Sequence, residues 1–102
     1  MSDYKLRYLP VFYDDLEQVT NYITDKLKNA PAAVRLVDDI EAAIKKRLAA
    51  PASFEVYESY KKRPRPYYRI YIRNYIVFYV VIDDVMEVRR LLYKKRNAGE
   101  KI

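Results

Sequence analysis

The sequence predicts an α+β fold in which a helical hairpin packs on one face of a mostly antiparallel four-stranded sheet, in the order β-α-α-β-β-β. Three observations support this fold class. A short alternating segment opens the chain, two segments of helical periodicity follow, and three β-branched and aromatic segments separated by tight turns come last. At 102 residues the chain fits one domain, residues 1–102, with a core large enough to fold without disulfides or a structural metal.

The first strand is expected at residues 4–9, where apolar and basic side chains alternate until Pro10. An αα-hairpin is expected over residues 12–50, because two runs of apolar residues recur at spacings of three and four. Asp14, Asp15 and Glu17 should lie in the first helical turn, where the helix dipole favours acids. The two apolar faces comprise Phe12, Leu16, Val19, Ile23 and Leu27 in the first helix, and Ala33, Val37, Ile40, Ile44 and Leu48 in the second.

Residues 51–66 form a basic loop in this interpretation, because they contain several prolines and show no sustained period. Lys61, Lys62 and Arg63 lie together within it, and residues 54–57 could add an edge segment to the sheet. A loop of this length in a compact domain is more often functional than not. We therefore expect this loop to contact a target.

A β-meander is expected over residues 67–93, followed by a basic tail at residues 94–102. Its turns are marked by Asn74 and by Asp83 with Asp84. The run at residues 75–82 is apolar throughout, as a central strand requires, so its aromatic side chains are assigned to the core or the sheet faces. The first strand should join this sheet at an edge.

The composition excludes several kinds of chemistry. Cys and His are both absent, which rules out a disulfide framework, a thiolate nucleophile and a conventional catalytic triad. Any catalysis must use Tyr, Lys, Arg, Asp or Glu. Asp83 and Asp84 do not make a metal site, because no third carboxylate accompanies them. The N-terminus is charged and the longest apolar run is too short to span a bilayer, so we expect a soluble, cytoplasmic protein with no membrane, metal or cofactor requirement.

Charge is strongly segregated along the chain. Residues 1–58 carry eight basic and ten acidic side chains, whereas residues 59–102 carry twelve basic and four acidic ones. The second half therefore has a net charge of +8, within a total of +6. Such a field suits nucleic acid or an acidic protein partner, with a merely solubilising surface as the alternative.

Several segments of the second half resemble one known family. These segments are Tyr68-Arg69-Ile70, then Asn74 to Val81, an acidic turn, and Arg90-Leu91-Leu92-Tyr93-Lys94-Lys95-Arg96-Asn97. Together with the element order, they make residues 4–97 similar to the RelE/ParE superfamily of bacterial toxins. The resemblance implies the toxin of a type II toxin–antitoxin module, neutralised by a cognate antitoxin that is acidic and partly disordered when free.

The superfamily acts in two ways, and the resemblance carries both over as hypotheses. One branch enters the ribosomal A site and cleaves mRNA as a metal-independent endoribonuclease, and the other blocks DNA gyrase without enzymatic activity. For cleavage, the resemblance implies Arg69, Tyr93, Lys95 and Arg96 as catalytic residues. The residues that it leads us to expect in nucleic-acid binding are Lys61, Lys62, Arg63, Arg73 and Lys94.

Structural roles remain open for the same residues, and the sequence departs from the cleaving branch. Arg69 could pair with Glu55 or Glu58, Tyr93 could simply finish the sheet, and residues 94–96 could be a solvated tail. Ile76 stands where the cleaving branch often has Arg, Tyr71 where some relatives have Lys, and an expected C-terminal Tyr is missing. The basic strands and tail favour mRNA cleavage, which is the first choice. The departures favour gyrase inhibition, and a weakened toxin or a plain interaction module is the third reading.

Overall fold

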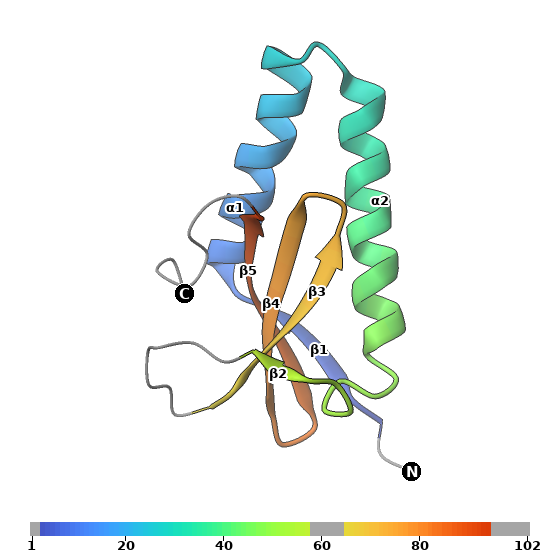
Figure 1. Cartoon of the computed structure of the whole chain (residues 1–102), viewed down its shortest axis with the longest axis vertical. Coiled ribbons are helices and arrows are strands. Elements are labelled where there is room, and N and C mark those ends of the chain that lie inside the picture. Colours follow the sequence, from blue (N-terminus) through green and yellow to red (C-terminus); the bar gives the residue numbers. More distant parts are fainter. Residues whose placement is uncertain (1–2, 58–64, 95–102) are drawn as a thin grey trace.

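The computed structural model describes residues 3–57 and 65–94. A sheet with the strand order β1-β5-β4-β3-β2 is covered on one side by a helical hairpin, which confirms the predicted fold class (Figure 1). The elements are β1 (Lys5–Tyr8), α1 (Pro10–Asn21), η1 (Tyr22–Lys26), α2 (Ala30–Arg47), β2 (Val56–Tyr57), β3 (Tyr67–Ile72), β4 (Tyr75–Ile82) and β5 (Val85–Tyr93).

The three C-terminal strands form the predicted antiparallel meander, with β4 at its centre. β1 joins at an edge, as expected, and runs parallel to β5 with Lys5 opposite Val85 and Tyr8 opposite Val88. The prediction of four strands is one short, because Val56 and Tyr57 pair with β3. This two-residue strand lies within residues 54–57, where an edge segment was considered.

The first helix begins two residues earlier than predicted. Pro10 occupies its first turn, where a fixed φ and a missing N–H cost nothing. Asp14, Asp15 and Glu17 consequently lie beyond the first turn, and the prediction that the dipole places them there is wrong. The helix then widens into the π-helical segment η1, and the chain leaves it through Lys28 with φ 53°.

The main core lies between the hairpin and the sheet. Most of the predicted apolar positions are buried or packed against this core, and Leu36 joins it although it was not predicted. Val37 is only partly buried, and Leu27 is 56% exposed. Figure 1 gives the reason for the exposure of Leu27: the hairpin extends beyond the ends of the strands, so its tip has no sheet beneath it.

A second, smaller cluster lies on the other side of the sheet, which we call the open face because no described helix covers it. Alternation along β4 separates the two clusters, with Val77 and Tyr79 toward the helices and Phe78 and Val80 toward the open face. All four of these side chains are fully buried, as a central strand predicts. The open-face cluster consists of Tyr67, Ile76, Phe78, Val80 and Leu92, with Ile82 packed against it.

A β-bulge interrupts the pairing of β4 with β5. Tyr79 pairs with Val88 and Phe78 with Arg90, so Arg89 is the extra residue. Arg89 hydrogen-bonds Tyr67 on the open face, whereas Arg90 pairs with Asp15 of α1. The two adjacent arginines therefore have partners in different elements.

Candidate functional site

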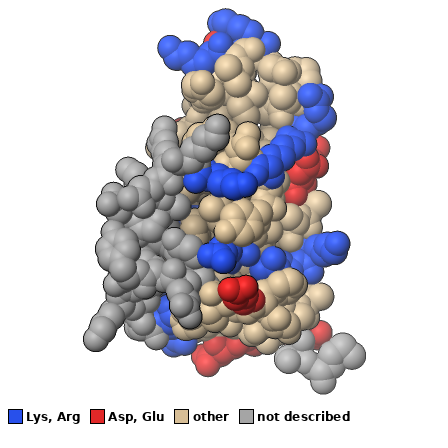
Figure 2. All heavy atoms as spheres, in the orientation of Figure 1, with Lys and Arg blue, Asp and Glu red and all other residues tan. Residues whose placement is uncertain are grey.

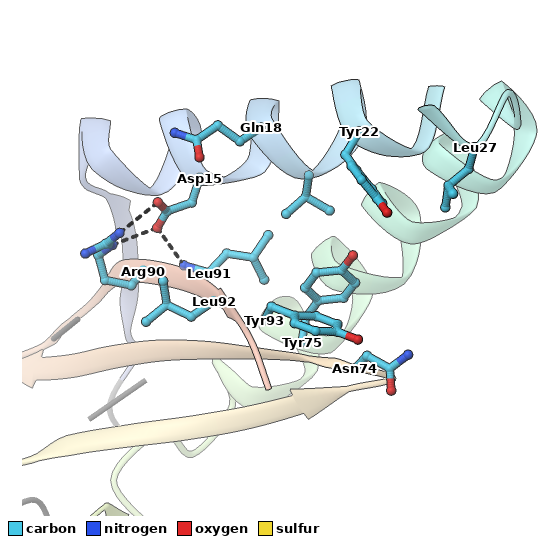
Figure 3. A pocket seen from close by; sticks show the side chains of 11 residues that line it. Asp15, Gln18, Tyr22, Leu27, Asn74, Tyr75, Arg90, Leu91, Leu92 and Tyr93 are labelled. Carbon is cyan, nitrogen blue, oxygen red and sulfur yellow. Dashed lines mark hydrogen bonds and ion pairs between the residues drawn. The ribbon is translucent and has the colours of Figure 1, made fainter. Parts of the chain in front are cut away.

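A groove of about 800 Å³ opens on the helix side, between the overhanging hairpin and the ends of β4 and β5 (Figure 3). One end is polar, with Asp15, Gln18 and Arg90, and the other is aromatic and aliphatic. Concave surfaces of this mixed character are where proteins commonly bind ligands or partner segments. The groove is lined by Asp15, Gln18, Val19, Tyr22, Leu27, Asn74, Tyr75, Arg90, Leu91, Leu92 and Tyr93.

Three tyrosines meet at the aromatic end. Tyr75 and Tyr93 are cross-strand partners whose ring centroids lie 5.6 Å apart, and Tyr22 faces them from η1. Burial raises the pKa of Tyr75, and the neighbouring Tyr93 and Tyr22 raise it further. The Tyr75 hydroxyl therefore stays protonated at neutral pH. It offers a hydrogen-bond donor and acceptor rather than a charge.

The polar end is closed by a buried ion pair. Asp15 accepts hydrogen bonds from Arg90 at both carboxylate oxygens, 2.7 Å from Nε and 2.9 Å from Nη2, and also from the backbone N–H of Leu91 at 3.0 Å. Asp15 is only 8% exposed. This contact fixes α1 to β5 beyond the end of β1, so the pair shapes the groove rather than offering free charge to a ligand.

On the open face, a chain of charged contacts crosses the sheet. Glu87 accepts from Arg7 at 2.7 Å and from Arg89 at 2.8 Å, and Arg89 also donates to the Tyr67 hydroxyl at 3.2 Å. Burial alone would raise the pKa of Glu87, but the hydrogen bonds and charges of Arg89 and Arg7 outweigh it and hold the pKa below its ordinary value. The Glu87 carboxylate is therefore ionised, and Arg7 and Arg89 balance its negative charge.

The end of the open face nearest the β3–β4 turn carries an exposed aromatic ring between two cations. Tyr71 is 55% exposed, and its ring centroid lies 5.6 Å from the Arg69 guanidinium and 5.9 Å from the Lys94 ammonium. Distances below about 6 Å permit cation–π attraction. In the view of Figure 2, Lys and Arg side chains lie across the part of the molecule where Figure 1 draws the sheet.

The structure brings some of the predicted site residues together and separates others. Arg69 and Lys94 flank Tyr71 on the open face, whereas Tyr93 lines the groove on the helix side. Arg73 lies in the β3–β4 turn and pairs with Asp39 of α2, so it fastens the turn to the hairpin. The remaining predicted residues, Lys61, Lys62, Arg63, Lys95 and Arg96, lie outside the described residues.

Sequence reasoning missed the groove and its ion pair. Asp15 follows Phe12 by three residues and precedes Val19 by four, which places it on the apolar face of α1. Arg90 likewise interrupts an otherwise apolar end of β5. Two opposite charges at positions expected to be buried could have predicted a buried pair. Nothing in the sequence indicates that the hairpin overhangs the sheet.

The described residues contain no group of three or more acidic, His or Cys side chains able to hold a metal ion. Within the same part of the chain, no helix combines the length and apolar character needed to cross a membrane.

Comparison with known families identifies the chain. The family model described as the ParE toxin of the type II toxin–antitoxin system, parDE, matches residues 6–98. The chain belongs to the ParE toxin family. It is thus a toxin of a type II toxin–antitoxin system, and the predicted membership of the RelE/ParE superfamily is confirmed.

Solved structures resemble this ParE family toxin in fold. A chain of the chromosomal ParDE system from P. aeruginosa is similar with a TM-score of 0.73 and 13% identity, over 89% of this chain and 96% of that one. A chain of the RelB-RelE antitoxin–toxin complex from Methanococcus jannaschii has a TM-score of 0.48 and 22% identity, over 87% of this chain and 91% of that one. No curated protein matches the sequence.

Proposed function

We propose that this ParE family toxin arrests growth by binding DNA gyrase and blocking it, without cleaving a bond in its target. This proposal differs from the order of the sequence-based hypotheses, in which mRNA cleavage came first and gyrase inhibition second. The family supports the change, because residues 6–98 match the ParE toxin and gyrase is the target that the resemblance implies for that branch.

The observation that carries the proposal is the separation of Arg69 from Tyr93. RNA cleavage requires a base, an acid and stabilising cations within reach of one scissile phosphate. Arg69 lies on the open face, opposite Phe78, whereas Tyr93 lies opposite Tyr75 on the helix side. The sheet stands between these two side chains, so they are poorly placed to contact the same phosphate.

Ile76 also supports gyrase inhibition over RNA cleavage. Relatives that cleave mRNA often carry Arg at this position, where it would bind phosphate. Here the side chain is 7% exposed and packs with Tyr67 and Leu92 in the open-face cluster. A buried apolar residue therefore takes the place of one cation that the cleavage mechanism uses.

We further propose that the cognate antitoxin seats an apolar segment in the groove on the helix side. Tyr22 and Leu27 expose more than half of their surface at its mouth, where a partner would bury them. The +8 charge of residues 59–102 suits an acidic segment that is partly disordered until it binds. Such a partner would be the product of the neighbouring gene.

The decisive experiment compares two activities of the same toxin, one with the purified protein and one in cells. We expect inhibition of DNA supercoiling by gyrase, and no cleavage of mRNA at the ribosomal A site by primer extension on induced cells. Arg69→Ala and the double change Lys95→Ala with Arg96→Ala should retain growth arrest, because they remove charges that only cleavage needs. Cleaved message together with normal supercoiling would overturn the proposal.

A further inference from the structure

The end of the helical hairpin projects beyond the sheet, and we call residues 22–29 the hairpin tip (Figure 1). Its exposed side chains are apolar and basic. Tyr22 and Leu27 each expose more than half of their surface, and Lys26 and Lys28 flank Leu27 in the sequence. Figure 2 shows basic side chains gathered at the end of the molecule where Figure 1 draws the tip.

The positive charge of the hairpin tip is not balanced by the rest of the described chain. Within residues 3–57 and 65–94, neither Lys26 nor Lys28 makes an ion pair. Residues 22–35 carry three basic side chains and one acidic side chain, so this end of the hairpin has a net charge of +2. An exposed apolar side chain between two such cations suits a protein surface with acidic side chains around an apolar hollow.

The backbone of the hairpin tip is unusual in two ways. The segment η1, Tyr22–Lys26, is π-helical, a rare conformation that occurs frequently at functional sites. Lys28 adopts φ 53°, where any residue with a Cβ is disfavoured relative to Gly. Strained residues of this kind cluster at binding and active sites. An exposed cation held at a position that favours Gly therefore indicates a role for Lys28 outside the fold.

Backbone hydrogen bonds hold the hairpin tip in one shape. The N–H of Leu27 donates to the carbonyl of Tyr22 at 3.2 Å. The N–H of Asn29 donates to the carbonyl of Ile23 at 3.1 Å. The side chain of Asn29 caps α2 by accepting a hydrogen bond from the N–H of Ala32 at 3.2 Å. A surface that is fixed before binding loses little conformational entropy when a partner docks.

We infer that the hairpin tip is the surface with which this toxin binds gyrase, with Leu27 in an apolar hollow and Lys26 and Lys28 against acidic side chains around it. The inference rests on the proposed function and adds to it the docking surface and the chemistry of the partner's site. An antitoxin segment seated in the groove would also cover Tyr22 and Leu27. The antitoxin and gyrase would therefore compete for the same side chains.

A protein partner explains the hairpin tip better than nucleic acid does. Phosphates would contact the two lysines, but they would leave the exposed Leu27 side chain without a partner. Asp25 precedes Lys26 in the sequence and would repel a phosphate. Dependence of binding on Leu27 therefore distinguishes a protein partner from a polynucleotide.

The test measures the concentration of purified toxin that halves supercoiling by gyrase, and the affinity of the toxin for each separate gyrase subunit without DNA. Two tip variants are compared with the wild type: Leu27→Ala, and the double change Lys26→Glu with Lys28→Glu. Each should raise the half-inhibiting concentration at least about fivefold, as changes at the centre of an interface do. Affinity for one of the two subunits should fall by the same factor.

Lys28→Gly separates binding from folding. It removes the backbone strain together with one cation, so it should raise the melting temperature of the toxin. The same change should raise the half-inhibiting concentration about twofold, because one charge at an interface is lost. A variant that is more stable and less active does not owe its weaker inhibition to misfolding.

Two control variants match these changes away from the hairpin tip. Val11→Ala trims an exposed apolar side chain at the start of α1. Lys45→Glu with Lys46→Glu makes the same change of charge at the opposite end of α2. Neither should shift the half-inhibiting concentration by more than about twofold, as for residues outside the interface. Melting temperatures show whether each variant is folded.

The outcomes distinguish the docking surface from the proposed function. If the wild type inhibits gyrase and both tip variants inhibit it equally well, the docking surface is wrong and gyrase inhibition stands. Equal losses in the control variants would also overturn the surface, because net charge or stability would then explain them. Loss in the double change alone, together with loss of duplex DNA binding measured by fluorescence anisotropy, would assign the tip to nucleic acid. No inhibition by the wild type would reject the proposed function and the docking surface together.

Discussion

At the scale of single residues, the contact between Asp15 and Arg90 is the interaction on which the groove depends. Replacing Asp15 by Ala would remove the carboxylate that pairs with the partly buried Arg90 and would also strip the Leu91 N–H of its acceptor. Breaking such a pair costs about 3 kcal/mol in the free energy of unfolding. We expect a loss of this size for Asp15→Ala in urea denaturation.

The neighbouring acid provides the control. Asp14 is exposed on α1, so Asp14→Ala should change the free energy of unfolding by less than about 0.5 kcal/mol. Similar losses in both variants would mean that helix propensity or net charge, and not the buried pair, determines the effect.

Glu87 makes the stability depend on pH. Its pKa in the folded protein lies below the ordinary value, so its stabilising effect is full above the unfolded pKa. This stabilisation is lost as the pH falls through the lowered folded pKa. We therefore expect the free energy of unfolding to drop more between about pH 5 and about pH 3 in the wild type than in Glu87→Gln.

Urea denaturation across this pH range tests the expectation, with Glu17→Gln as a change of the same kind at an exposed position of α1. The profile of Glu17→Gln should follow the wild type. Parallel profiles for the wild type and Glu87→Gln would contradict the role assigned to the contacts with Arg7 and Arg89.

At the scale of elements, the end of the first helical segment is the least regular part of the hairpin. Lys28 adopts φ 53°, a left-handed conformation in which a side chain with Cβ is disfavoured by about 1 kcal/mol. Lys28→Gly should therefore raise the free energy of unfolding by up to this amount. Lys26→Gly should lower it by about 1 kcal/mol, because Lys26 is still within η1.

Thermal unfolding distinguishes the two changes by their opposite signs. They remove the same charge two residues apart, so an electrostatic effect would shift both melting temperatures in the same direction. A lower melting temperature for Lys28→Gly would show that the Lys28 side chain contributes more than its backbone strain costs.

At the scale of the whole molecule, two surfaces of different character lie on opposite faces of one sheet. The groove takes its shape from the overhang of the hairpin and its chemistry from tyrosines and aliphatic side chains (Figure 3). The open face has cations around an exposed ring. The two surfaces therefore suit ligands of different chemistry.

Much of this architecture could be predicted from the sequence because it follows from local patterns. The central strand is recognisable from its continuous apolar run, and the αα-hairpin from its spacing of three and four. Leu27 was assigned to the core by the same rule, and wrongly, because periodicity defines the face of a helix but not how far the sheet extends beneath it.

The candidate site could be predicted only in part. Arg69 and Tyr93 were grouped by their resemblance to known motifs, and their separation depends on strand parity and on the bulge at Arg89. A bulge adds one residue to a strand, so the side chains after it face the opposite side from the one that simple alternation predicts. No residue type marks a bulge in the sequence. Residues 58–64 and 95–102, which hold five predicted site residues, lie outside the described structure.

By itself, the sequence determined the fold class, the segregation of positive charge into residues 59–102, and the absence of any Cys or His chemistry. These depend only on composition and on periodicity within single elements. The tertiary structure alone decided that Arg89 and Arg90 have different partners, that Asp15 is buried against Arg90, and that a groove opens beneath the hairpin. Those features depend on contacts between residues up to 76 positions apart, which no local pattern records.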